Sequence, residues 1–218
     1  MTETPQRAYG GQTADARRRQ RRARLLDAAM DAIAGNAWRT ITVERLCADA
    51  GLNKRYFYES FGTLDDVATA AVDDIADDVR VATMNAAERT GDETLDRQAW
   101  AAVDALVRTL VEDPRRGRVL LGGVASSVAL HEHRSTVLRG LTAVLVSHAR
   151  SVHGVELERD PLAEVAPAFI IGGTADAILA YLDGRAEVTV EELVTGLATL
   201  WLITGNGAAE VARLRLQQ

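Results

Sequence analysis

The strongest constraint on the fold is the short distance between two predicted helices in the stretch "TVERLCADAGLNKRYFYESFG", residues 42–62. Thr42 is suited to cap the first helix, and Gly51 lies just past its end. Only Gly51 and Leu52 separate this helix from a second one, which Asn53 can cap. Two short helices joined by such a tight turn are typical of a helix-turn-helix motif.

Helical periodicity and capping residues extend over the rest of the chain. Apolar residues recur at helical spacing in a first helix over residues 14–34 and in a long helix over residues 63–89. Thr63 with Asp66, and Thr189 with Glu192, have the spacing of capping boxes. Further helices are expected over residues 93–112, 115–130, 134–153, 161–183 and 190–205. No segment shows sustained period-two alternation, so the sequence predicts an all-α fold.

The N-terminus and the cysteine content favour a cytoplasmic protein. Residues 1–13 are rich in Gly, Thr, Gln and Pro and are expected to form a flexible tail. This end carries Glu3 and Asp15 and lacks the apolar segment of a signal peptide. Cys47 is the only cysteine, so an internal disulfide is impossible. No stretch approaches the apolar run that a membrane span needs, and no membrane partner is expected.

The net charge of −6 conceals an uneven distribution. Residues 1–62 hold 11 Lys and Arg against 7 Asp and Glu, a balance of +4. Residues 63–218 hold 14 against 24, a balance of −10. A basic head on an acidic body indicates that the head meets an anion.

The second helix of the predicted motif has two different faces. Phe57 and Phe61 fall close together on a helical wheel and can pack against the neighbouring helices. The residues left on the other faces are Lys54, Arg55, Tyr56 and Tyr58. Arginine and lysine can bind guanine edges in a major groove, and tyrosine hydroxyls can donate to phosphates. The alternative is an amphipathic surface helix whose tyrosines cover the core.

A second basic feature is the run "RRRQRRAR", residues 17–24. It fits either a solvated face at the start of the first helix or an arm that contacts the DNA backbone or minor groove. Helix N-termini at Thr42 and Thr63 are also candidate phosphate contacts. The complete set of predicted DNA-contacting residues is Arg22, Thr42, Arg45, Asn53, Lys54, Arg55, Tyr56, Tyr58 and Thr63.

The stretch "TITVERLCADAGLNKRYFYESFGTLDDV" resembles the DNA-binding region of the tetracycline-repressor (TetR) family of one-component regulators. The similarity covers about residues 20–68. The positions that match the family pattern are Trp38, Thr42, Val43, Leu46, Ala50, Gly51, Phe57, Tyr58 and Phe61. Cys47, Ser60 and Leu64 depart from the pattern, and Leu64 stands where the family usually has a lysine for phosphate contact. Lys54, Arg55 and Tyr56 fill the variable positions with which the family reads its own operator.

The resemblance implies a division of the chain and a set of partners. Residues 14–62 would form a three-helix DNA-binding domain, and residues 63–218 a helical ligand-binding and dimerisation domain. The implied protein is a homodimeric repressor that binds a near-palindromic operator and is released from it by an unidentified small-molecule effector. The implied dimer interface lies on the last two helices, at Phe169, Gly172, Gly173, Asp176, Leu179 and Trp201. No cofactor is expected.

Other features of the body favour no separate chemistry. The histidines, which are His131, His133, His148 and His153, lack the spacing of a metal site. The aspartates of residues 73–78 are expected to form a solvated acidic face, and Trp100 is expected in the core. No catalytic constellation is present, so no enzyme is predicted. The alternative function is an all-α ligand-binding or enzymatic protein whose helix-turn-helix makes only protein contacts.

Overall fold

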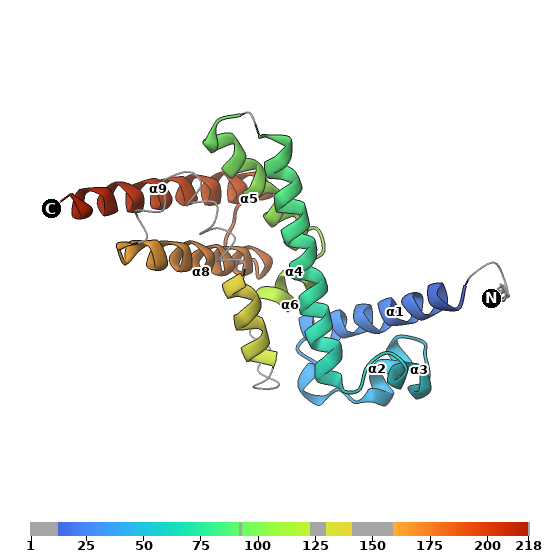
Figure 1. Cartoon of the computed structure of the whole chain (residues 1–218). Helices are drawn as coiled ribbons and strands as arrows, with labels where there is room; N and C mark the ends of the chain where they lie inside the picture. The colour runs from blue at the N-terminus through green and yellow to red at the C-terminus, as the bar shows by residue number, and fades with distance from the viewer. Residues whose placement is uncertain (1–12, 92, 123–129, 141–158, 218) are drawn as a thin grey trace, which may run out of the picture.

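A computed structural model describes residues 13–91, 93–122, 130–140 and 159–217. These residues form helices and connecting turns with no strand among them, which confirms the all-α prediction (Figure 1). The predicted tail lies outside the described residues except for Thr13, which caps the first helix. The helices are α1 (Ala14–Ala34), the 3-10 helix η1 (Trp38–Thr40), α2 (Val43–Asp49), α3 (Lys54–Tyr58), α4 (Leu64–Arg89), α5 (Leu95–Val111), α6 (Pro114–Leu121), α8 (Leu162–Leu182) and α9 (Val190–Leu216). Residues 130–140 are also helical.

Local capping chemistry sets where most helices begin. Thr42, Asn53 and Thr63 each accept a hydrogen bond from a backbone amide three residues further on, at 3.1–3.2 Å. Both predicted capping boxes form, at the start of α4 and of α9. Asp113 caps α6, with Pro114 in its first turn. The predicted helix starts at these positions are therefore confirmed.

The helices α1, α2 and α3 form a head at one end of the molecule (Figure 1). Leu25 of α1, Leu46 of α2 and Phe57 of α3 are fully buried against one another's helices. Gly51 makes the turn between α2 and α3 with a φ of +61°, a conformation that costs other residues energy because their Cβ atom approaches the carbonyl oxygen. The turn thus brings α3 across α2 and onto α1.

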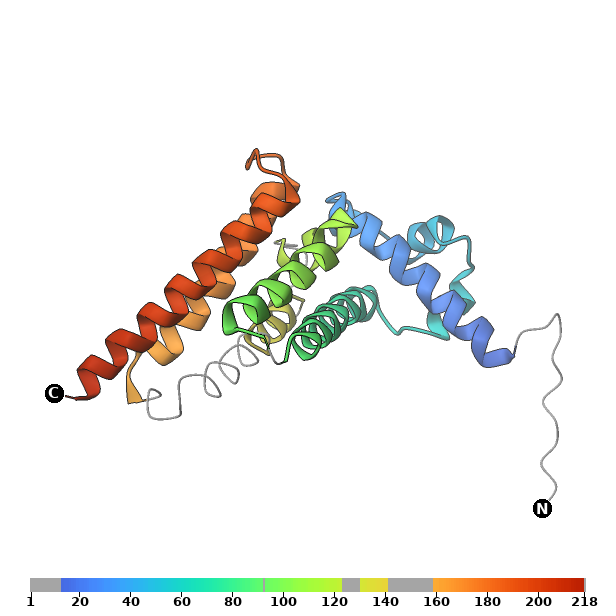
Figure 2. The ribbon, with the colours of Figure 1, turned by 90° about the horizontal axis from the view of Figure 1, so that it is seen from above.

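The body is built around α4. The beginning of α4 packs on α1, and α4 also packs along α5, which in turn packs on α9. The helices α8 and α9 lie side by side on the far side of the body from the head (Figures 1 and 2). The helix α6 contacts α1, α4, α5 and α8, and so stands between head and body.

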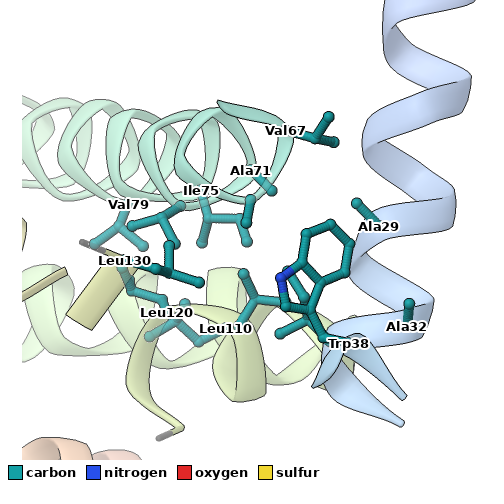
Figure 3. Close-up of a cluster of buried hydrophobic side chains, with 14 of the residues drawn as sticks. Ala29, Ala32, Trp38, Val67, Ala71, Ile75, Val79, Leu110, Leu120 and Leu130 are labelled. Atoms are coloured by element: carbon teal, nitrogen blue, oxygen red, sulfur yellow. The ribbon is translucent and has the colours of Figure 1, made fainter. Parts of the chain in front are cut away.

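One hydrophobic core runs from the head into the body. Figure 3 shows Val67, Ala71, Ile75 and Val79 in a row along α4, with Trp38 near one end and Leu120 and Leu130 near the other. The same cluster includes Phe57 of α3 and Leu193, Val194 and Leu197 of α9. The proposed boundary at residues 62 and 63 therefore divides the chain at a helix cap, while the packed core continues across it.

Two predicted helices end elsewhere. The helix expected over residues 115–130 ends at Leu121, where Gly122 has extended backbone angles, and residues 123–129 lie outside the description. The helix expected over residues 190–205 continues to Leu216, where Ala209 and Ala212 are buried beyond the expected end. Of the helix expected over residues 134–153, the structure describes the part up to residue 140.

Two further expectations need correction. Trp100 is 46% exposed and not in the core, because it lies one turn before the buried stripe of α5 that begins at Val103. The helix α8 is long and apolar enough to cross a membrane by length and composition alone, with a mean hydropathy of 1.6 in its best window and 28% of that window buried. Only Glu164 and Asp176 interrupt it with charge, so the expectation that no stretch approaches the apolar run of a membrane span is wrong for α8. Helices of soluble proteins that pack against other helices can have the same composition.

Candidate nucleic-acid interface

The helix α3 presents one face to the core and another to solvent. Phe57 is fully buried and Phe61 is 8% exposed, with their ring centroids 6.3 Å apart. Tyr58 meets Phe57 edge-on at 5.2 Å and is itself 61% exposed. The packing rings and the outward residues are thus separated as the helical wheel predicted.

The three cations of this surface are all engaged with carboxylates of the head. Arg55 Nε donates to Glu59 Oε1 at 3.0 Å, and Arg45 Nε donates to Asp49 Oδ2 at 2.9 Å. Lys54 Nζ of α3 pairs with the Glu44 carboxylate of α2. The hydrogen bond from Lys54 lowers the pKa of Glu44, and the same bond raises the pKa of Lys54. All three cationic side chains remain more than half exposed.

The arginine run is part of α1 and divides into two groups. Arg21, Arg22 and Arg24 turn towards the rest of the protein, whereas Arg17, Arg18 and Arg19 are exposed and form no ion pair within the described part of the chain. Residues 17–24 are therefore helical. The contacts of Arg21, Arg22 and Arg24 within the protein determine which arginines of the run remain available to contact DNA.

The inward arginines brace the helix-turn-helix. The Arg21 guanidinium lies 4.4 Å from the centre of the Tyr56 ring and pairs with Glu59 at 3.5 Å. Arg24 Nη2 donates to the carbonyl oxygen of Gly51 at 3.2 Å, which fastens the turn to α1. Sequence reasoning missed both contacts, because they join residues 27 to 38 positions apart.

Arg22 was predicted to contact DNA, and the structure places its partly exposed side chain where the head meets α4. Its guanidinium lies 4.9 Å from the centre of the Phe61 ring and 4.0 Å from Asp74 of α4. Burial raises the pKa of Asp74, while Arg22 acts in the opposite direction. The role of Arg22 at DNA stays a prediction, and its observed contacts hold α1 on α4.

Some of the groups at helix starts that were predicted to contact phosphates already make hydrogen bonds within the protein. The backbone amide of Thr63 donates to Asp66 Oδ2 at 2.9 Å, and the amide of Gly62 donates to the same oxygen at 3.1 Å. The side chains of Thr42 and Asn53 serve as N-caps, so they position α2 and α3. Their roles at DNA also stay predictions.

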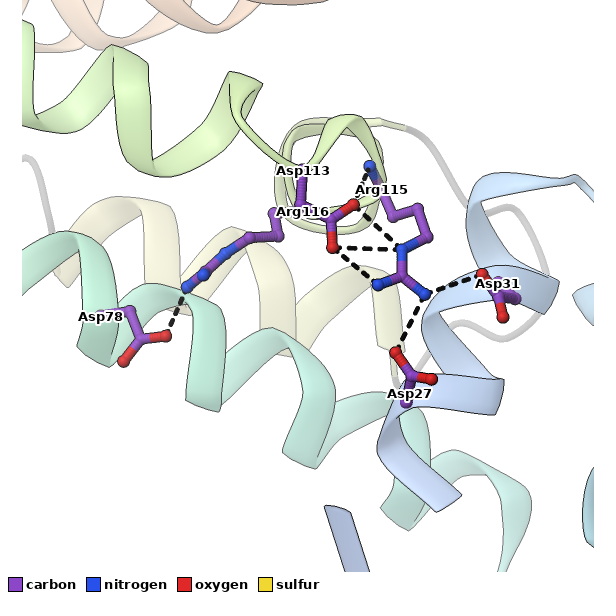
Figure 4. A network of polar contacts seen from close by, with 6 residues as sticks. All are labelled: Asp27, Asp31, Asp78, Asp113, Arg115 and Arg116. Carbon is purple, nitrogen blue, oxygen red and sulfur yellow. Dashed lines mark hydrogen bonds and ion pairs between the residues drawn. The ribbon is translucent and has the colours of Figure 1, made fainter. Parts of the chain in front are cut away.

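A network of arginines and aspartates joins the head to the body (Figure 4). Arg115 of α6 donates from Nη1 to Asp27 at 2.9 Å and to Asp31 at 2.8 Å, both on α1. Its Nε and Nη2 donate hydrogen bonds to the Asp113 carboxylate, and these bonds lower the pKa of that carboxyl. Arg116 pairs with Asp78 of α4. The helix α6 is thus fastened to both helices of the head–body junction.

The aspartates of residues 73–78 are exposed, as predicted, and some of them also make contacts that the sequence did not indicate. Asp73 lies 2.7 Å from His133 Nε2, and Asp77 pairs with Arg80 at 3.1 Å. No group of three metal-ligating side chains is found in the described ranges. His148 and His153 lie outside them.

The predicted dimer residues of α8 share an exposed face. Phe169 is 68% exposed, and Gly172, Gly173 and Asp176 are exposed beside it at helical spacing. A Cβ atom added at either glycine would meet nothing within 4 Å, so packing within one chain does not require glycine there. On α9 a matching exposed stripe is formed by Gly196, Leu200, Ile203 and Gly207.

The other two predicted dimer residues lie partly inside the chain. Leu179 is half-buried, and so is Trp201, whose Nε1 donates to Thr174 Oγ1 at 2.7 Å. Trp201 therefore ties α9 to α8 within one protomer. Its place in a dimer interface stays a prediction.

Comparison with known proteins finds similarity in structure. No family model and no curated protein matches the chain. A putative TetR-family transcriptional regulator from Syntrophomonas wolfei has a TM-score of 0.72 at 12% identity, covering 86% of this chain and 96% of that one. The fatty acid degradation regulator FadR from Bacillus halodurans has a TM-score of 0.66 at 17% identity, covering 84% and 94%. FadR from Bacillus subtilis in complex with stearoyl-CoA has a TM-score of 0.64 at 16% identity, covering 82% and 96%.

These similarities span almost the whole length of the solved proteins. They show that the chain has the fold of TetR-family regulators, as the motif in residues 42–62 indicated. The solved proteins named above are transcriptional regulators and not enzymes.

Proposed function

We propose that the chain is a DNA-binding transcriptional regulator, acting as a repressor that a small-molecule effector releases from its operator. The observation that carries the proposal is the geometry of α3, which buries Phe57 and exposes Lys54, Arg55 and Tyr58 on one outer surface. That surface suits a major groove, where arginine can bind the O6 and N7 atoms of guanine together.

The direct test is to identify the operator. Footprinting on the DNA upstream of the protein's own coding region, and selection from random duplexes, should both return a near-palindromic site. Two heads that enter successive major grooves would place its half-sites about 34–36 Å apart. If neither method yields a preferred duplex, the proposed function is wrong.

Arg55 provides the residue-level test. Arg55→Ala should weaken operator binding by about 1–3 kcal/mol and relax selectivity at one base position. Arg97→Ala is the matched control, because Arg97 of α5 also forms an exposed ion pair with a carboxylate four positions away, that of Glu93, but lies in the body. Equal weakening on operator and random duplexes would contradict a base-reading role for Arg55.

The role of the exposed arginines is tested through salt dependence. If residues 1–19 contact phosphates, their deletion should flatten the plot of log affinity against log salt by about 0.9 per lost contact. An unchanged slope would support the alternative, a solvated basic face.

We propose that the exposed faces of α8 and α9 form a homodimer. The support is the pair of stripes in which small residues alternate with bulky apolar ones, since glycines allow two helices to approach closely. Phe169→Glu should yield a monomer in analytical ultracentrifugation. Val81→Glu, a change of an equally apolar and 47% exposed residue on α4, should leave the dimer intact. Loss of the dimer in both variants would point to general unfolding.

The effector is proposed to bind in the body and to shift the distance between the two heads. Such a shift requires different affinities for the two arrangements. A long-chain acyl-CoA is the first ligand to test, because one structurally similar regulator was solved with stearoyl-CoA. Binding should raise the midpoint of thermal unfolding and lower operator affinity together.

A further inference from the structure

The outer surface of the helix-turn-helix contains as many carboxylates as cations. Each cation of residues 42–59 has a carboxylate partner from the same segment: Arg45 with Asp49, Lys54 with Glu44, and Arg55 with Glu59. Glu59 also receives Arg21 at 3.5 Å, so it is held between α3 and α1. The side chains of Glu44 and Asp49 are 60% and 39% exposed, so their negative charges would repel an approaching phosphate.

These carboxylate partners reduce the free energy that the cations gain when the surface binds DNA. A cation that is already paired gains less from a phosphate, because it must leave its carboxylate or bring a negative charge against the DNA backbone. This loss applies to every duplex, whatever its sequence. At an operator the freed cation gains bidentate hydrogen bonds to guanine, and a freed carboxylate can accept from the N4 amino group of cytosine.

We propose that Glu44, Asp49 and Glu59 are specificity-determining residues that suppress binding to DNA of arbitrary sequence. The inference rests on the proposed DNA-binding function. It assigns to acids on the reading surface a role that the cations alone would not reveal. The ratio of operator affinity to random-duplex affinity should therefore depend on these carboxylates.

The magnitude follows from the exposed nature of the pairs. An exposed ion pair contributes at most about fivefold to an equilibrium constant. Removing one carboxylate should thus raise affinity for a random duplex by about three- to fivefold. It should also add up to one phosphate contact, which steepens the salt dependence of random binding by about 0.9 in slope. Operator binding should change by less than about twofold, because there the gain from removing the ion pair is offset by the loss of the hydrogen bond that the freed carboxylate accepts from cytosine.

The experiment uses the full-length protein and its selected operator. Fluorescence anisotropy at several salt concentrations compares wild type with Glu44→Gln, Glu59→Gln and the double variant, on operator and random duplexes. Gln keeps the size of the side chain and removes its charge. Asp77→Asn is the matched control, because it removes one negative charge and one exposed ion pair on α4, away from the reading surface.

The expected result is a lower affinity ratio in both single variants and a further decrease in the double variant, with no change in the control. An equal rise on both duplexes, or a fall in the ratio for Asp77→Asn as well, would show a general effect of net charge and overturn the inference. An unchanged ratio would overturn it while leaving the DNA-binding function standing. Failure of the wild type to select any duplex would overturn both.

Discussion

Replacing Arg115 with methionine should weaken the junction between the head and the body. Methionine keeps an apolar stem and removes the guanidinium that joins α6 to Asp27 and Asp31 of α1. Those two carboxylates are 61% and 64% exposed, so each contact should contribute about 0.2–1 kcal/mol. The fork on Asp113 is only about one-third exposed and charge-assisted on both oxygens, which adds about 1–2 kcal/mol. The total loss should be about 1.5–4 kcal/mol.

A double-mutant cycle isolates the part that crosses the junction. Arg115→Met is combined with Asp27→Asn and Asp31→Asn together, and urea unfolding of each variant is followed at one protein concentration, since a dimer's stability depends on concentration. The coupling free energy should be about 0.5–1.5 kcal/mol. Arg80→Met is the control, because Arg80 pairs with Asp77 within α4 alone. A coupling indistinguishable from zero would refute the assignment of Arg115 as the link between α1 and α6.

Low pH should reduce the difference in unfolding free energy between wild type and Arg115→Met. The pKa of Asp113 is lowered in the folded protein by its hydrogen bonds from Arg115. Its contribution is therefore fully present above the ordinary aspartate pKa of about 3.9 and is lost as pH falls through the lower folded value. The gap in unfolding free energy between wild type and Arg115→Met should be constant from about pH 5 to 7 and should shrink below about pH 4. A gap that widened in acid would contradict this assignment.

Three smaller perturbations test the construction of the head. Gly51→Ala should cost about 1–2 kcal/mol from its positive φ, and more if Arg24 cannot move, because the new Cβ would meet its guanidinium; thermal unfolding measures this. Phe57→Ala should cost about 3–5 kcal/mol, whereas Tyr58→Ala at the exposed neighbouring position should cost less than about 1 kcal/mol; comparable losses would contradict the assigned faces. Cys47 should resist alkylation at neutral pH until the protein unfolds, because burial raises the pKa of its thiol; rapid labelling of the native protein would contradict that burial.

The features that could be predicted from the sequence are those fixed by a few neighbouring residues. Thr42, Asn53 and Thr63 cap their helices because a hydroxyl or amide oxygen reaches an amide three residues away, whatever the rest of the fold does. The turn at Gly51 is of the same kind, since it depends on the backbone conformation of one residue. These local signals were enough to give the all-α fold and the two faces of α3.

The features that escaped prediction depend on packing between distant segments. The sequence showed a run of arginines at residues 17–24 but not that Arg21 and Arg24 turn back onto the helix-turn-helix. The pairs Arg45–Asp49 and Arg55–Glu59 could have been recognised from their spacing of four residues along a helix. The pair between Lys54 and Glu44 could not, because it requires the angle at which α3 crosses α2.

The length of α4 means that a small tilt of this helix in the body produces a larger displacement of the head. This helix has 26 residues and is therefore about 39 Å long, with the head fastened near its beginning and the body along the remainder. A rigid tilt of about 5° at the body end would carry the head through about 3.4 Å, which is the rise of one base-pair step. Angular changes too small to disturb side-chain packing in the body would thus be read at the DNA as whole steps of the double helix.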